Sequence, residues 1–365
     1  MNTKKKDIVL CGLFALLLVG GFLLYLILPE KKYSESERRM LSPVPNLSAE
    51  GIWSGRFMSD FESWAEDAFP FRDSFRRIKA LTAKNAFLRQ DNHGIYAANG
   101  FLAYVEYPMH EKSLAHAAER FSSVCKKHLT DENRVYLSVV PDKNCFLAKE
   151  SGHLSMNYAE FEEQMKEYAD FAEYIEISDL LEKEDYYKTD THWRQERIAD
   201  VADRLASAMG ATLSQDYEVH TQKKDFYGVY YGQAALPLAP DVMRYVTGDE
   251  IKSCKVYDWQ NQKDIQVYDM EKAAGRDPYE MFLSGSLSLV TMKNPKDQMG
   301  KRLILFRDSF GSSIAPLLLS GYAQIDLVDL RYIHPDYLGQ FIDFEDCDVL
   351  FLYSTLVLNH SDTIK

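Results

Sequence analysis

Residues 303–311 read LILFRDSFG, a short apolar run followed at once by polar residues. The four apolar residues Leu303 to Phe306 have the length of a buried strand, and we expect a helix to begin near Ser312. Open α/β sheets bind their ligands at the edge where parallel strands end and helices begin. The segment therefore predicts an α/β fold with a parallel sheet, in which Ser309 lies at the functional edge.

Strands and helices alternate on both sides of this segment, which favours a parallel sheet covered by helices on both faces. A stretch rich in Tyr, Gly and Pro, about 213–294, predicts an irregular insertion. Before the alternation, aromatic residues at helical spacing predict two helices over 53–87, divided at Pro70. We expect strands at 134–140, 174–177, 303–306, 325–328 and 349–352, a hairpin at 95–107, and helices at 114–129, 158–172 and 193–209.

A second polar segment, residues 187–193, reads YKTDTHW. A serine is a weak nucleophile by itself and needs an imidazole base, which a carboxylate orients. Asp190 and His192 supply both groups two residues apart, so the carboxylate can reach one ring nitrogen while the other faces Ser309. A helix N-cap role for Asp190 or Thr191, with Ser309 as a simple turn residue, also explains the pattern. Spacing alone therefore leaves the triad open.

Together, the two segments and the apolar amino-terminal stretch resemble the DHHW family and the related alginate O-acetyltransferases of the SGNH-hydrolase-like group. Asp190 to Trp193 match the D-x-H-W element, and Asp308 with Ser309 resembles the G-D-S nucleophile block of SGNH hydrolases. Two positions depart from these patterns, because Thr191 stands where the family name has His and Arg307 stands where the nucleophile block has Gly. Further segments that look similar lie at 37–43, 69–72, 140–143 and 226–232.

The resemblance implies an SGNH-hydrolase-like parallel sheet flanked by helices, with Ser309 as nucleophile, His192 as base and Asp190 as the residue that orients it. It implies a serine O-acetyltransferase or esterase that acts on a cell-surface or exported polysaccharide. Members of this kind often work beside a multi-spanning membrane acyltransferase that brings acetyl groups across the membrane. The Ser309 amide is the first candidate for an oxyanion donor, and Asn359 is the second.

Two other functions stay open, namely a non-catalytic glycan-binding or polysaccharide-assembly protein on the same fold, and hydrolysis of small esters or lipids. Tyr227, Tyr230 and Tyr231 are candidates for stacking on a sugar, because aromatic faces with polar tips suit amphipathic ligands. Packing within the core explains these tyrosines as well. Lys143 and Arg307 are candidates for binding an acidic substrate, although such residues more often pair locally.

The stretch Ile8–Leu28 contains 21 residues without a charge, which as a helix span about 30 Å, the thickness of the hydrocarbon core. It ends at Leu28, Pro29 and Glu30 without a small-residue cleavage site, so we expect an uncleaved signal anchor. Lysines before the stretch favour a cytoplasmic amino terminus, although basic residues also follow it. We expect a cytoplasmic tail at 1–7, a transmembrane anchor at 8–28, a juxtamembrane linker at 29–52, and an α/β domain at 53–365 outside the plasma membrane.

The composition argues against several other classes of protein. The 365 residues include 55 acidic residues against 42 Lys plus Arg, a net charge of -13, which is the reverse of what a nucleic-acid-binding protein needs. None of the five cysteines forms a C-x-x-C pair, and zinc-finger spacing is absent, so we expect no metal site. Walker and dinucleotide-binding patterns are also absent, so we expect no nucleotide cofactor.

Overall fold

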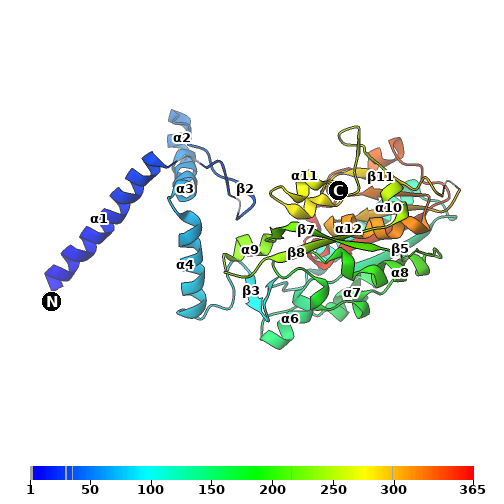
Figure 1. The fold of residues 1–365 in the computed structure, drawn as a ribbon, viewed down its shortest axis with the longest axis horizontal. Coiled ribbons are helices and arrows are strands. Elements are labelled where there is room, and N and C mark those ends of the chain that lie inside the picture. The colour runs from blue at the N-terminus through cyan, green and yellow to red at the C-terminus, as the bar shows by residue number, and fades with distance from the viewer. Residues whose placement is uncertain (1–2, 29–30, 35, 215, 298) are drawn as a thin grey trace. The chain divides into compact units, whose positions relative to one another are not determined.

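The structure is a computed structural model, and it describes residues 3–28, 31–34, 36–214, 216–297 and 299–365. Residues 1–2 of the predicted tail and residues 29, 30 and 35 of the predicted linker lie outside the described part. The chain divides into two compact units, whose elements are drawn in Figure 1. One unit comprises Met1–His93 with Tyr231–Pro237, and the other comprises Gly94–Tyr230 with Leu238–Lys365.

The larger unit is built on an eight-stranded sheet. Five of its strands, from β13 to β6 in sheet order, run parallel, and three more extend the sheet with antiparallel pairing. Leu305 in β12 pairs with Leu327 on one side and Leu350 on the other. In sheet order the strands are β10 (Lys263–Ile265), β9 (Lys255–Asp258), β11 (Leu289–Lys293), β13 (Gln324–Val328), β12 (Arg302–Arg307), β14 (Asp348–Ser354), β5 (Arg134–Val140) and β6 (Glu173–Tyr174).

Both faces of this sheet are buried under helices (Figure 1). Leu303 and Leu305 belong to the core on one face, which includes residues of α8 (Ala199–Ala208) and α12 (Ser309–Leu318). Ile304 and Phe306 belong to the core on the other face, with residues of α5 (Glu111–His128) and α7 (Tyr158–Tyr168). Alternate residues of one strand therefore enter two cores, as the continuous apolar run requires. The predicted α/β fold with a sheet flanked by helices is confirmed.

Helices α12 and α8, which lie next to the candidate site residues, begin at other residues than expected. Helix α12 begins at Ser309 and not near Ser312, because the Asp308 side chain caps it. Helix α8 begins at Ala199, whereas Trp193 lies in an isolated bridge with Tyr186. The catalytic candidates thus lie at the end of a strand, at a helix start and in a loop, where side chains can converge.

The range 213–294 is more regular than expected, because β9, β10 and β11 join the central sheet. These strands have three to five residues, so they are too short for an alternating pattern to stand out. The rest of the range contains a hairpin of β7 (Glu218–Phe226) and β8 (Asp241–Thr247), and the short helices α9 (Val229–Ala234), α10 (Asp249–Ser253) and α11 (Met270–Ala273). Other short elements of the larger unit are β3 (Ile95–Ala98), β4 (Phe101–Tyr104), α6 (Asn144–Ser151) and α13 (Thr355–Leu358).

The smaller unit begins with α1 (Thr3–Ile27). Among the helices of the described residues, this one alone is long and apolar enough to cross a membrane, with a mean hydropathy of 2.6. Pro70 separates two later helices at the predicted position. The remaining elements are β1 (Tyr33–Ser34), β2 (Arg39–Met40), α2 (Ala49–Trp53), α3 (Arg56–Ala68) and α4 (Arg72–Asn85).

Candidate active site

Ser309 lies at the carboxyl edge of the sheet, where β12 gives way to α12. The preceding Asp308 is fully buried, and one of its carboxylate oxygens accepts the Phe310 amide at 3.0 Å. Its other oxygen accepts the amide and the hydroxyl of Ser354 at 2.8 and 2.6 Å. Because Ser354 ends the neighbouring strand β14, this carboxylate ties the turn that carries Ser309 to the ends of two adjacent strands.

Ser309, His192 and Asp190 form a continuous series of hydrogen bonds. His192 Nε2 lies 2.7 Å from Ser309 Oγ, and His192 Nδ1 lies 2.6 Å from Asp190 Oδ2. Asp190 is 1% exposed, and its other oxygen accepts the Val229 amide at 2.7 Å. A proton on Nδ1 donated to this carboxylate leaves Nε2 free to accept the Ser309 hydroxyl proton. The arrangement can therefore activate the serine as a nucleophile.

The loop 187–193 that carries Asp190 and His192 is fastened at its first half by a buried carboxylate. Asp241 accepts the amides of Lys188 and Thr189, both at 2.8 Å, and the Thr189 hydroxyl at 2.6 Å. The same Thr189 hydroxyl accepts the Gly228 amide at 2.8 Å. These bonds hold the backbone just ahead of Asp190 in one conformation.

Lys143 fastens the same loop from inside the protein. It is 2% exposed, and its Nζ donates to the Tyr187 carbonyl at 2.7 Å and lies 5.2 Å from the centre of the Tyr230 ring. Burial lowers the pKa of Lys143 to about 7, against the opposing effect of Asp241 and Asp190. The expectation that Lys143 meets an acidic substrate is therefore wrong, because its ammonium is enclosed and donates to the backbone.

Tyr279 lies flat against the imidazole of His192. The two ring centres are 3.7 Å apart and the planes differ by 9°. The Tyr279 hydroxyl lies 2.9 Å from Ser313 Oγ, which also accepts the Trp193 indole N–H at 2.8 Å. Burial raises the pKa of Tyr279 well above its ordinary value, so its hydroxyl stays protonated. Ser313 of α12 thus holds both Tyr279, which stacks on His192, and the indole of Trp193.

The two candidate oxyanion donors have different surroundings. The amides of Phe310 and Gly311 already donate to Asp308, whereas no acceptor for the Ser309 amide is found among the described residues. Asn359 is 1% exposed, and its side-chain amide donates to Glu106 at 2.5 Å and to the Pro108 carbonyl at 2.9 Å. The Asn359 prediction is therefore wrong, since both of its N–H groups are engaged.

The three candidate tyrosines do not share one environment. Tyr230 is buried, its hydroxyl lies 3.2 Å from Thr191 Oγ1, and burial raises its pKa. Tyr231 belongs to the smaller unit, where its hydroxyl accepts a hydrogen bond from Arg77 at 3.0 Å. Tyr227 is 40% exposed. Within the larger unit, therefore, Tyr227 offers a ring to solvent and Tyr230 does not.

Arg307 is enclosed beneath the serine turn and is fully buried. Its guanidinium lies 3.7 Å from Asp329, and its Nε has no hydrogen-bond partner among the described residues. A Cβ on Gly311 would lie 2.5 Å from Arg307 Cβ, so glycine at 311 makes room for this side chain. Burial lowers the pKa of Arg307, while Asp329 opposes the shift. The expectation that Arg307 binds an acidic substrate is therefore wrong.

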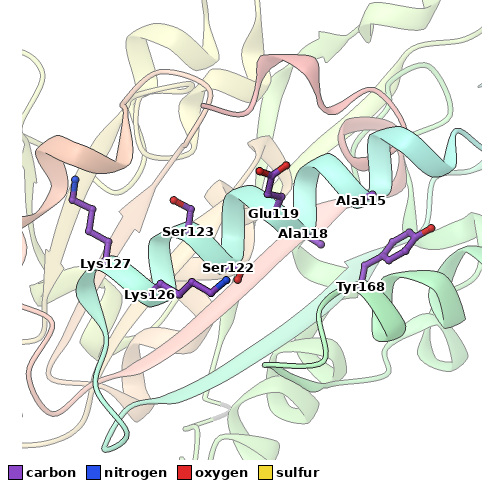
Figure 2. Close-up of a pocket in the computed structure, with 8 residues that line it drawn as sticks. All are labelled: Ala115, Ala118, Glu119, Ser122, Ser123, Lys126, Lys127 and Tyr168. Carbon is purple, nitrogen blue, oxygen red and sulfur yellow. The ribbon is translucent and has the colours of Figure 1, made fainter.

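Sequence reasoning missed Asp241, Tyr279 and Ser354. Each is far along the chain from the residues that it supports, and each lies at a strand end or in a short turn without periodicity. A hollow of about 630 Å³ lies elsewhere in the larger unit, along α5, where Figure 2 shows Glu119, Ser123 and Tyr168 among its lining residues. None of the three triad candidates lines it.

The sequence matches no family model and no curated protein. The structure is similar to a DHHW family protein from Eubacterium siraeum, with 18% identity and a TM-score of 0.58, over 74% of this chain and 93% of that chain. It is also similar to Bacillus cereus PatB1, with 18% identity and a TM-score of 0.56, over 74% of this chain and 98% of that chain. PatB1 has also been solved with a sulfonyl adduct. The resemblance to the DHHW family is thus confirmed in the fold.

Proposed function

We propose that this chain is a membrane-anchored serine O-acetyltransferase or acetylesterase that acts, outside the plasma membrane, on a cell-surface or exported polysaccharide. The observation that carries the proposal is the hydrogen-bonded series from Ser309 through His192 to Asp190, at 2.7 and 2.6 Å. Nucleophile, base and orienting carboxylate stand in the order that acyl transfer requires. Helix α1 supplies the anchor.

The reaction proceeds through an acetyl-enzyme. His192 Nε2 takes the hydroxyl proton while Ser309 Oγ attacks the carbonyl carbon of an acetyl donor. The tetrahedral intermediate collapses, the bond to the leaving group breaks, and His192 returns the proton to that group. A sugar hydroxyl then attacks the acetyl-enzyme with His192 again as base, which transfers the acetyl group and regenerates Ser309. Water in place of the sugar gives esterase activity.

The substrate class and the partner rest on the resemblance to the alginate O-acetyltransferases. An acetyl donor outside the membrane requires a supply of acetyl groups, and a multi-spanning membrane acyltransferase is the proposed source. The buried Lys143 and Arg307 offer no charge to an acidic polymer, so recognition falls to other groups such as the exposed ring of Tyr227.

The first test is covalent labelling of the full-length chain in detergent micelles. A sulfonyl fluoride reacts with an activated serine, and mass spectrometry of the digested protein locates the adduct. We expect the adduct on Ser309, with labelling abolished in Ser309→Ala and slowed about 10³-fold or more in His192→Ala. Ser312→Ala is the control, because this neighbouring serine of α12 lies outside the series and is buried, whereas Ser309 is half-buried.

The second test measures release of 4-nitrophenol from its acetate ester, with and without oligosaccharide acceptors. Turnover that needs Ser309 and His192, together with acetylated oligosaccharide, supports a transferase, and turnover to acetate alone supports an esterase. Turnover that survives both substitutions contradicts the triad. A wild-type chain that is neither labelled nor active, yet binds polysaccharide, favours the non-catalytic glycan-binding alternative.

A further inference from the structure

Helices α3 and α4 of the smaller unit carry several large, exposed apolar side chains. Phe71 immediately precedes α4, Phe75 and Ile78 follow at helical spacing on it, and the three are 62%, 44% and 59% exposed. On α3, Phe61 is 43% exposed and packs against Trp64 at a ring distance of 5.4 Å. Large apolar rows of this kind on soluble surfaces mark sites that contact a membrane or another protein.

The apolar row is joined to α1 by direct aromatic contacts. Trp64 lies edge-on to Tyr25 of α1, with ring centres 5.5 Å apart. The Phe69 ring packs on Gly21, where an added Cβ would lie 3.4 Å from it. Phe69 in turn lies 5.5 Å from Phe75. Packing is thus continuous from the middle of the apolar amino-terminal stretch to the exposed row of α4.

The position of Gly21 sets the depth of these contacts. Gly21 lies seven residues before Leu28, the end of the apolar stretch, and seven helical residues rise about 10 Å. With α1 across the membrane, Gly21 therefore lies roughly one third of the way into a hydrocarbon core about 30 Å thick. A ring packed on Gly21 shares that depth, and Phe75 packs on that ring.

We propose that α3 and α4 lie in the outer leaflet of the bilayer, with the row Phe61, Phe71, Phe75 and Ile78 facing the acyl chains. The inference rests on α1 crossing the membrane. It gives the chain a second attachment to lipid, of the kind that amphipathic interfacial helices make.

The charges of this region are arranged to permit such an insertion. Asp67 accepts a two-pronged hydrogen bond from Arg39 at 2.6 and 2.8 Å, and Arg72 and Arg76 pair with Glu37. In this cluster three arginines thus face two carboxylates, and each of the two carboxylates is paired within the smaller unit. Lys79 and Lys84 of α4 are exposed, where anionic lipid headgroups attract them.

Tryptophan fluorescence in lipid nanodiscs tests the proposal on the full-length chain. The variants Phe75→Trp, Ile78→Trp and Lys84→Trp are compared with the parent, in anionic lipids with and without bromine on the acyl chains. We expect bromine to quench about half or more of the emission added by Phe75→Trp and Ile78→Trp, and little of that added by Lys84→Trp, because Lys84 lies nine residues after Phe75 and therefore on the opposite face of α4. Two positions on α4 are used so that local misfolding of one variant cannot by itself produce the expected quenching.

Leu17→Trp, in the middle of α1, reports the anchor separately. Quenching at Leu17→Trp without quenching at Phe75→Trp and Ile78→Trp overturns the proposal, because the anchor then spans the bilayer while the row faces water or a protein. Emission from Phe75→Trp and Ile78→Trp that is blue-shifted but not quenched by bromine also overturns the proposal. In that case a second copy of the chain or a protein partner, and not lipid, buries the row. Absence of quenching at Leu17→Trp removes the premise and also overturns the proposal. None of these variants touches Ser309 or His192, so the outcome is independent of the proposed chemistry.

Discussion

The Tyr279 ring lies parallel to the His192 imidazole, with ring centres 3.7 Å apart and planes inclined by 9°. The stack restrains rotation of the imidazole out of the plane that joins Asp190 to Ser309. The hydroxyl of Tyr279 is held by Ser313, so the phenol ring is itself fixed. The orientation of the base therefore depends on a residue 87 positions further along the chain, in addition to its carboxylate partner.

Replacement of Tyr279 by Leu removes this stack. Aromatic pairs contribute about 0.5–1.5 kcal/mol beyond burial, so we expect kcat with an acetate ester to fall by about 3- to 10-fold. Tyr279→Phe keeps the stack, loses the bond to Ser313, and should retain most of the wild-type kcat. Equal loss in both variants would assign the effect to the hydroxyl instead of the ring.

Replacement of Asp241 by Asn tests whether the hydrogen bonds of this carboxylate position the loop 187–193. Three donors converge on this carboxylate, and an amide N–H in place of one oxygen would face a donor. We expect labelling of Ser309 by a sulfonyl fluoride to slow by about 10- to 100-fold, because small displacements of reacting groups have effects of that size. Asp264→Asn, at an exposed carboxylate of β10, is the control. Unchanged labelling in Asp241→Asn would exclude a role for the fastening.

Replacement of Asp308 by Asn tests the turn that carries the nucleophile. The substitution turns one of two acceptors into a donor facing Ser354, a buried mismatch that costs about 2 kcal/mol of unfolding free energy. Ser354→Ala removes one of the bonds and should cost about 1 kcal/mol. Urea unfolding of the detergent-solubilised chain measures both. Equal stability of Asp308→Asn and the wild type would contradict the link between β12 and β14.

Glu106 predicts a pH dependence of stability. Burial raises the pKa of this carboxyl to about 7, against the hydrogen bond from Asn359, while nearby Asp142 adds to the shift. Its Oε1 lies 3.0 Å from His360 Nε2, and its Oε2 has no hydrogen-bond partner among the described residues. Because the folded pKa lies above the unfolded one, the folded state holds this proton more tightly. Protonated Glu106 therefore contributes to the free energy of unfolding, and this contribution is fully present below about pH 4.3 and is lost as the pH rises through 7.

We therefore expect the unfolding free energy of the wild type to fall between pH 5 and pH 8 by an amount of the order of 2 kcal/mol from this group. Glu106→Gln, which cannot ionise, should show a smaller fall over the same interval. Denaturant titrations at the two pH values measure the difference. Parallel curves for the two proteins would show that Glu106 ionises in the folded state as it does in water.

The parallel part of the fold could be predicted from sequence because its strands are continuous apolar runs. Leu303 to Phe306 enter two cores at once, and burial on both faces leaves a pattern that one chain displays by itself. The antiparallel extension by β9 and β10 could not be predicted. β9 alternates in burial over only four residues, and β10 has three residues of which none is buried, so neither leaves a pattern that distinguishes a strand from a turn.

In the candidate site, too, some residues could be predicted from sequence motifs and others depend on contacts that only the fold creates. The sequence predicts Asp190, His192 and Ser309 as a group through the D-x-H-W and D-S elements that resemble the DHHW family, because spacing alone leaves the triad open. Lys143, Arg307 and Asn359 have the right chemical groups too, but their role depends on burial and on partners that only the fold brings near. Asn359 was predicted as a donor to substrate, whereas Glu106, more than 250 positions away, takes its amide.

The order of the strands has a consequence for how the chain folds as it is synthesised. β14 follows every other strand of the sheet in the chain, yet it lies between β12 and β5. Synthesis from the amino end delivers β5 early and β14 late, so β12 and β5 lack the strand between them until the last part of the chain is made. Ser354 arrives with that strand, and until then Asp308 lacks its partner. The turn that carries Ser309 is therefore completed only when almost the whole chain is available to fold.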